Sequence, residues 1–129
     1  MWRSSKTRRQ EIWEEEIQWP IGDIAAAKRI RDICSAASDS AERIRAVSRP
    51  PQGKKAKDQV ERYERAAKAA MEIAMKMSDE LMRDASVRRI VDLCMSANDL
   101  KTSRILFRAI QAPSILKDAL NDYPSLGQQ

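Results

Sequence analysis

Apolar side chains recur at steps of three and four residues through most of the chain, the pattern of helices that bury one face. The longest such stripe lies within 56–85. The opposite face of that stretch alternates acids and bases four residues apart, as in Glu61–Arg65, and this order supports a helix. The pattern predicts one long central helix over 56–85, and its inward stripe comprises Val60, Tyr63, Ala67, Ala70, Ala74, Met77 and Leu81.

Two shorter stripes precede this stretch. The first predicts a helix over 7–18, because Thr7 and Gln10 have the spacing of a capping box. The second covers 24–47 and is compatible either with one continuous helix or with two helices that meet near Asp39.

Capping residues and helix breakers suggest the element boundaries. Asp23 is a suitable N-cap for the helix that begins at 24. Two prolines and a glycine make 49–55 a linker, because they cannot continue a helix. Ser114 is expected to cap the last short helix. In the second half, the stripes and breakers predict helices over 86–97, 100–111 and 114–120, followed by a polar tail over 124–129.

The fold class predicted is an all-α, single-domain bundle of five or six helices. The length of the chain, 129 residues, suits one domain. The low content of Gly and Pro also favours helices over sheets. Along the chain, the domain comprises a first half (1–48), a basic linker (49–55), the central helix with the second half (56–123), and a tail (124–129).

An internal repeat relates 25–39 to 85–99 at an offset of 60 residues. It predicts two similar helical units, one on each side of the central helix. Seven of the fifteen aligned positions are identical, namely Ala25/Ala85, Arg29/Arg89, Ile30/Ile90, Asp32/Asp92, Cys34/Cys94, Ala37/Ala97 and Asp39/Asp99.

The chain has no apolar run near the roughly 20 residues that a membrane helix requires. The acidic run 11–16 lies where a signal peptide would have its apolar stretch. We therefore expect a cytoplasmic protein with no membrane partner. Its two cysteines are expected to be reduced in that compartment.

The residue types argue against an enzyme. The chain contains no histidine, which removes the common nucleophile–base pairs and most zinc sites. Cys34 and Cys94 both fall on apolar stripes, where cysteine acts as a small hydrophobe. No Gly-rich phosphate loop occurs. We expect no catalysis, metal, cofactor or small-molecule substrate.

The net charge of +5 lies entirely in the first half of the chain. Residues 1–57 hold 13 Lys and Arg against 8 Asp and Glu, whereas 58–129 hold 11 against 11. Clustered cations without acids favour sequence-independent contact with nucleic-acid phosphates, and the alternative is a solubilising surface. The candidate residues are Arg3, Lys6, Arg8, Arg9, Lys28, Arg29, Arg43, Arg45, Arg49, Lys54, Lys55, Lys57, Arg88 and Arg89.

Aromatic and methionine side chains indicate a protein interface. All three tryptophans lie in the first twenty residues, and methionines widen the apolar stripe of the predicted central helix. Tryptophan is enriched at interfaces, and methionine adapts to varied partners. The alternative is that the tryptophans close the end of the bundle. The candidate interface residues are Trp2, Trp13, Trp19, Met71, Met75 and Met82.

In size, basicity and all-helical character, the chain resembles the small subunits of multi-protein CRISPR interference complexes. The resemblance implies a ribonucleoprotein role in antiviral defence, along the path of RNA or single-stranded DNA and without catalysis. A stand-alone helical adaptor, either a homodimer or a regulator of another protein, is the first alternative. A second is a DNA-binding helix-turn-helix over 92–106, although that segment lacks the usual turn glycine.

Overall fold

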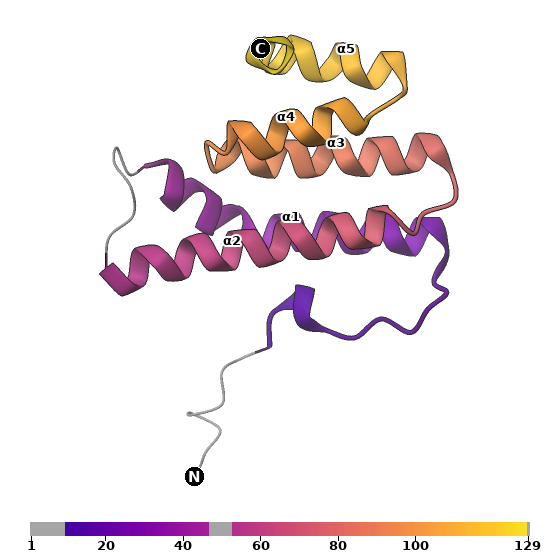
Figure 1. Ribbon diagram of the computed structural model, residues 1–129. Coiled ribbons are helices and arrows are strands. Elements are labelled where there is room, and N and C mark those ends of the chain that lie inside the picture. Colours follow the sequence, from indigo (N-terminus) through magenta and orange to yellow (C-terminus); the bar gives the residue numbers. More distant parts are fainter. Residues whose placement is uncertain (1–9, 47–52, 129) are drawn as a thin grey trace.

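The computed structural model of the protein describes residues 10–46 and 53–128 (Figure 1). These residues form helices and no strand, so the predicted all-α fold is confirmed. Two short 3-10 helices, η2 (Ile12–Glu14) and η3 (Pro124–Gly127), precede and follow the α-helices. The five α-helices are α1 (Gly22–Arg45), α2 (Gly53–Ala74), α3 (Glu80–Ser96), α4 (Leu100–Ala109) and α5 (Pro113–Asp122).

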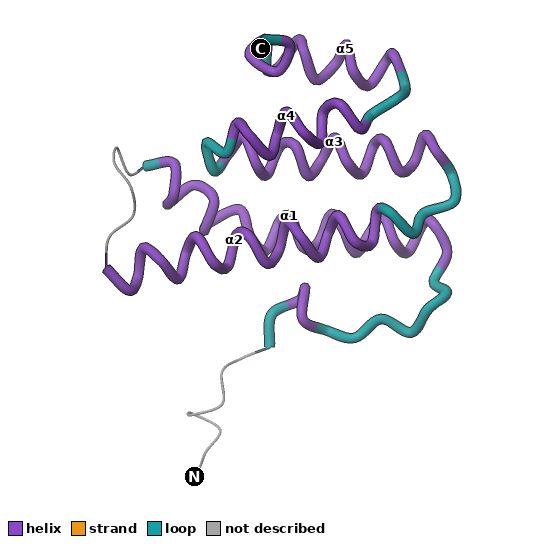
Figure 2. The backbone as a smooth tube through the Cα atoms, in the orientation of Figure 1, coloured by secondary structure: helices purple, strands orange, loops and turns teal. Residues whose placement is uncertain are grey.

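The helices are stacked in layers (Figures 1 and 2). Helices α1 and α2 pack against each other, and α3 lies against both of them. Helix α4 packs on α3, and α5 packs on α3 from the same outer side, beside η3. The N-terminal segment 10–21 crosses the α1–α2 pair on the side away from α3 (Figure 2).

Helix α3 is the element around which the others pack, since it contacts α1, α2, α4 and α5. A helix enclosed in this way needs buried positions on more than one face. Its buried side chains do follow more than one stripe along the helix, and they are Asp84, Ser86, Val87, Ile90, Val91, Leu93 and Cys94.

The predicted single helix over 56–85 is wrong, because the structure divides this stretch between α2 and α3. The backbone N–H groups of Ser78 and Asp79 donate to the carboxylate of Asp23, at 2.9 and 2.7 Å. Asp79 in turn caps α3 by accepting from the N–H of Met82 at 2.8 Å. Leu81, the predicted last member of the inward stripe, is 59% exposed.

Two predictions for the N-terminal half also fail. No α-helix occurs within 10–18, where the chain forms only η2 before it continues in an irregular path; Thr7 lies outside the described residues. Asp23 does not cap α1, whose N-cap position is Ile21, because its carboxylate binds the α2–α3 turn instead. Helix α1 runs unbroken past Asp39, which settles the alternative left open for 24–47.

Most of the C-terminal predictions hold with small shifts. Asn98 adopts a left-handed conformation, with a φ of 60°, and Asp99 caps α4 by accepting from the N–H of Thr102 at 3.2 Å. The predicted cap at Ser114 is wrong, because α5 begins at Pro113 with Ala112 at the N-cap position, which places Ser114 inside the helix. The tail is not simply polar, because η3 buries Leu126 in the core.

The two repeat segments occupy α1 and α3, which pack directly against each other. They therefore do not lie on opposite sides of a central helix, as the repeat predicted. Their aligned residues nonetheless play similar parts, since Lys28–Asp32 and Arg88–Asp92 are both ion pairs across one helical turn. A common origin of the two segments stays a prediction.

Cys34 and Cys94 are free and buried, one on each of these two helices, so their predicted place in the core is confirmed. Burial is the main cause that raises the pKa of the Cys34 thiol to about 12 and that of Cys94 to about 11. Both groups are therefore protonated near neutral pH, which leaves little of the reactive thiolate.

We expect Asp23→Ala to lower the free energy of unfolding by about 1–2 kcal/mol, because two backbone N–H groups of the α2–α3 turn lose their acceptor. Urea unfolding followed by circular dichroism measures this. Asp39→Ala is the control, since Asp39 is exposed on α1 and makes no polar contact among the described residues. Equal stability of the two variants would contradict the bridging role of Asp23.

We expect Cys94 to react with iodoacetamide about 100-fold more slowly in the folded protein than in denaturant at about pH 8, and Cys34 more slowly still. Mass spectrometry of peptides over time measures the rates. Fast labelling of either thiol in the folded state would show that the α1–α3 contact opens.

Candidate nucleic-acid interface

Five exposed cations gather at one end of the bundle, where α1 finishes and α2 begins. In Figure 1 these two helix ends flank the grey segment at the left. Among the residues that the structure describes, none of the five side chains makes an ion pair or hydrogen bond. This set is called the basic end and comprises Arg43, Arg45, Lys54, Lys55 and Lys57.

The helix dipoles act differently on the two halves of the basic end. Arg43 and Arg45 lie in the last turn of α1, where positive charge is favourable. The lysines of α2 begin a helix whose first turn contains no acid, and there positive charge opposes the dipole. Glu42 and Asp58 are the exposed acids in the neighbouring positions, so the cations remain in excess.

Six predicted residues fall outside the described ranges, 10–46 and 53–128. They are Trp2, Arg3, Lys6, Arg8, Arg9 and Arg49.

The four predicted cations of the repeat segments serve different purposes. Arg29 donates to the carbonyls of Ile12 and Glu15, at 2.9 and 2.7 Å, and so fixes the N-terminal segment to α1. Lys28 is exposed but hydrogen-bonded to Asp32, and this bond lowers the pKa of that carboxyl. Arg89 is exposed, and the described part of the chain offers it no ion-pair partner.

Arg88 joins α3 to α5. Its side chain is only 11% exposed and pairs with Asp92, Asp118 and Asp122, while its guanidinium lies over the ring of Tyr123. Burial lowers the pKa of Arg88, but its hydrogen bond to Asp92 and the surrounding carboxylates raise it on balance. Arg29 and Arg88 are therefore held in internal contacts and do not extend the basic end.

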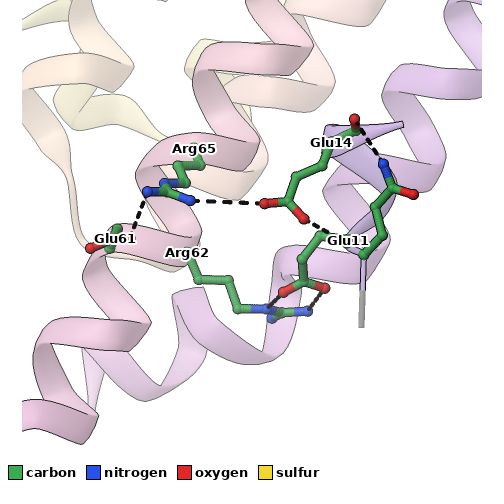
Figure 3. Close-up of polar contacts among 6 residues, drawn as sticks. Glu11, Glu14, Glu61, Arg62 and Arg65 are labelled. Carbon is green, nitrogen blue, oxygen red and sulfur yellow. Dashed lines mark hydrogen bonds and ion pairs between the residues drawn. The ribbon is translucent and has the colours of Figure 1, made fainter. Parts of the chain in front are cut away.

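A second cationic cluster, which sequence analysis missed, lies beside the basic end on α2 (Figure 3). Arg62 pairs with both carboxylate oxygens of Glu11, and Arg65 lies 3.8 Å from the carboxylate of Glu14 and 2.9 Å from that of Glu61. Contacts between residues 51 positions apart leave no local signal in the sequence. In the sequence, only the acidic run 11–16 indicates that a surface of basic residues lies against it.

The predicted interface residues are divided between the core and the surface. Trp13 is half-buried, with Arg62 4.9 Å from its ring centroid. Met71 and Met82 also pack partly against the core, whereas Trp19 and Met75 are exposed. Exposed apolar residues occur around the α2–α3 turn and the start of α1, far from the basic end; this apolar end comprises Trp19, Ile24, Met75 and Leu81.

The helix-turn-helix candidate forms a compact hairpin of α3 and α4. Ser103 is buried and donates to the carbonyl of Asp99 at 2.8 Å, and Arg104 donates to the carbonyl of Ser125 at 3.3 Å. Two polar side chains of the predicted recognition helix are thus engaged inside the protein. This arrangement does not favour base recognition by α4.

Tyr63 of α2 makes an internal polar contact with the residue that caps α4. The hydroxyl of Tyr63 donates to Asp99 at 2.7 Å, and burial is the main cause that raises the pKa of Tyr63.

The described residues contain no cluster of three or more acidic or thiol side chains suited to a metal ion. None of the described helices combines the length and apolarity that crossing a membrane requires.

In comparisons with known proteins, the chain matches no family model, no curated protein and no solved structure. The geometry of the basic end, the α2 arginines and the apolar end is therefore what bears on function.

Proposed function

We propose that the protein is a non-catalytic helical subunit of a nucleoprotein assembly, in which the basic end contacts nucleic-acid phosphates independently of sequence. The observation that carries this proposal is the placement of Lys54, Lys55 and Lys57. All three are exposed at the N-terminal end of α2, and none has a partner among the described residues.

Positive charge at the N-terminal end of α2 destabilises this helix in the free protein, because the lysines repel the positive end of the helix dipole. A bound phosphate would reverse the balance, since it interacts favourably with both the lysines and the dipole. Arg43 and Arg45 add to the same field from α1. The arrangement therefore suits an anionic ligand better than it suits the stability of the free protein.

Polyanion backbone is the ligand class that such a surface fits best. Flexible, exposed lysines provide charge without a fixed geometry, which suits contact with successive phosphates more than recognition of bases. The apolar end lies away from the basic end and leaves a separate surface for protein partners within the assembly.

We expect Lys54→Glu, Lys55→Glu and Lys57→Glu together to abolish binding of single-stranded RNA and DNA. The corresponding Gln substitutions should cause a smaller loss of affinity. Their log–log salt slope should become shallower by about 2, since three phosphate contacts disappear. Because Glu favours a helix N-terminus, the Glu variant should unfold at equal or higher urea concentration than the wild type. Fluorescence anisotropy over a salt series and urea unfolding measure the two effects.

The matched control is the triple variant Lys68→Glu, Lys101→Glu and Lys117→Glu. These exposed lysines lie outside the basic end, and the net charge changes by the same amount. Equal loss of binding in both variants would show a general charge effect rather than a site. Absence of binding by the wild type at low salt would refute the nucleic-acid proposal and favour a helical adaptor that uses the apolar end.

A further inference from the structure

The N-terminal segment 10–21, called the arm, is held on α1 and α2 largely through side chains. Ile12, Trp13 and Ile17 pack against the core, and Arg29 binds two arm carbonyls. Within 16–21, no backbone–backbone hydrogen bond to the described residues occurs. The acidic side chains Glu11 and Glu14 reach the α2 arginines (Figure 3).

Arg62 is arranged to receive an anion. One terminal nitrogen donates to the hydroxyl of Ser40 on α1 at 2.7 Å, and Ser40 is fully buried. The other two nitrogens, Nε and the second terminal nitrogen, each donate to one carboxylate oxygen of Glu11 and form a two-point contact. Because Ser40 would still position the guanidinium without Glu11, a phosphate group could take the same two donors.

The α2 arginines continue the basic end along one helix. Lys54 and Arg65 line the same open groove, about 390 Å³ in volume, together with Arg62. Lys54 and Arg65 lie eleven residues apart on α2, which corresponds to about 16 Å along the helix axis.

The arm sets the sign of the charge in this groove. Its lining contains three cations, Lys54, Arg62 and Arg65, against the acids Glu11, Glu14, Asp58 and Glu61. Glu11 and Glu14 come from the arm, and without them the cations outnumber the acids. The arm pairs are partly open to solvent, since the side chains of Arg62 and Arg65 are 31% and 53% exposed. The Arg65–Glu14 pair is long and more exposed and is therefore weak. The two-point Arg62–Glu11 contact is stronger, so its displacement needs a ligand with several phosphates.

We propose that Arg62 and Arg65 form a second part of the phosphate-binding surface, and that Glu11 and Glu14 occupy it in the free protein. Nucleic acid bound at the basic end displaces these carboxylates from the arginines and thereby extends its contact along α2. This inference rests on the proposed function and adds an intramolecular competitor to it.

The test compares Glu11→Gln/Glu14→Gln with wild type in anisotropy measurements on a labelled single-stranded oligonucleotide. We expect about tenfold tighter binding at low salt, because the oligonucleotide no longer has to displace two carboxylates from the arginines. The gain should vanish when Arg62→Gln/Arg65→Gln is added. Circular dichroism and urea unfolding confirm that each variant retains its helices.

Glu16→Gln/Glu80→Gln is the charge-matched control. Both residues are exposed, and neither pairs with any part of the chain that the structure describes. This variant should bind the oligonucleotide with nearly unchanged affinity. An equal gain in affinity for the control would overturn the proposal, because general charge would then explain the effect.

Trp13 supplies an independent readout, since Arg62 covers its ring in the free protein. Because Trp13 lines the same groove, saturating oligonucleotide should decrease acrylamide quenching of the wild-type fluorescence, and Trp13→Phe should remove that decrease. Unchanged quenching together with an unchanged affinity in Glu11→Gln/Glu14→Gln would overturn the arm proposal.

The two proposals fail in different ways. Binding that depends on Lys54, Lys55 and Lys57 but ignores Glu11 and Glu14 would refute the arm while the basic end stands. Binding only after Glu11→Gln/Glu14→Gln would refute the proposed function of the basic end and show that the ligand cannot displace the arm carboxylates. No binding by either protein would overturn both.

Discussion

The enclosure of α3 is the constraint on which the rest of the structure depends. A helix with neighbours on several sides cannot direct its polar groups to solvent, so each buried polar group needs a partner from another element. Asp84 accepts from the backbone N–H groups of Gln111 and Ala112, and Arg88 pairs with Asp118 and Asp122 of α5. The polar residues of α3 therefore help to position α5, in addition to the apolar packing of α3 against α1.

This enclosure also explains where charge remains available. Cations near the bundle's interior, such as Arg29 and Arg88, are held in internal contacts. The ends of α1 and α2 that carry the basic end project beyond the region covered by α3 (Figure 1). Their cations meet few acids, so uncompensated positive charge gathers at this end among the residues that the structure describes.

The arm connects these two kinds of cation. Glu11 and Glu14 neutralise Arg62 and Arg65, while Lys54 at the edge of the same groove keeps its charge uncompensated by any described partner. A carboxylate in a two-point contact with arginine uses the geometry that a phosphate uses. The same contacts that attach the arm to the bundle thus provide a means of regulating the phosphate surface that we propose.

Local pattern determined the helical class, the stripes of α1 and α3, the break between the helices predicted over 86–97 and 100–111, and the surplus of cations in the first half. These features depend on neighbours within one or two helical turns, which is the range that sequence periodicity reports. The buried place of both cysteines also followed from that periodicity.

Only the tertiary structure decided where the stretch 56–85 breaks, because Asp23, more than fifty residues away, binds the N–H groups of Ser78 and Asp79. It likewise decided that the acidic run 11–16 forms an arm rather than a helix, since Arg29 and Arg62 bind its carbonyls and carboxylates from two helices. Contacts between distant residues leave no periodic trace in the chain. They arise only once packing brings the two partners together.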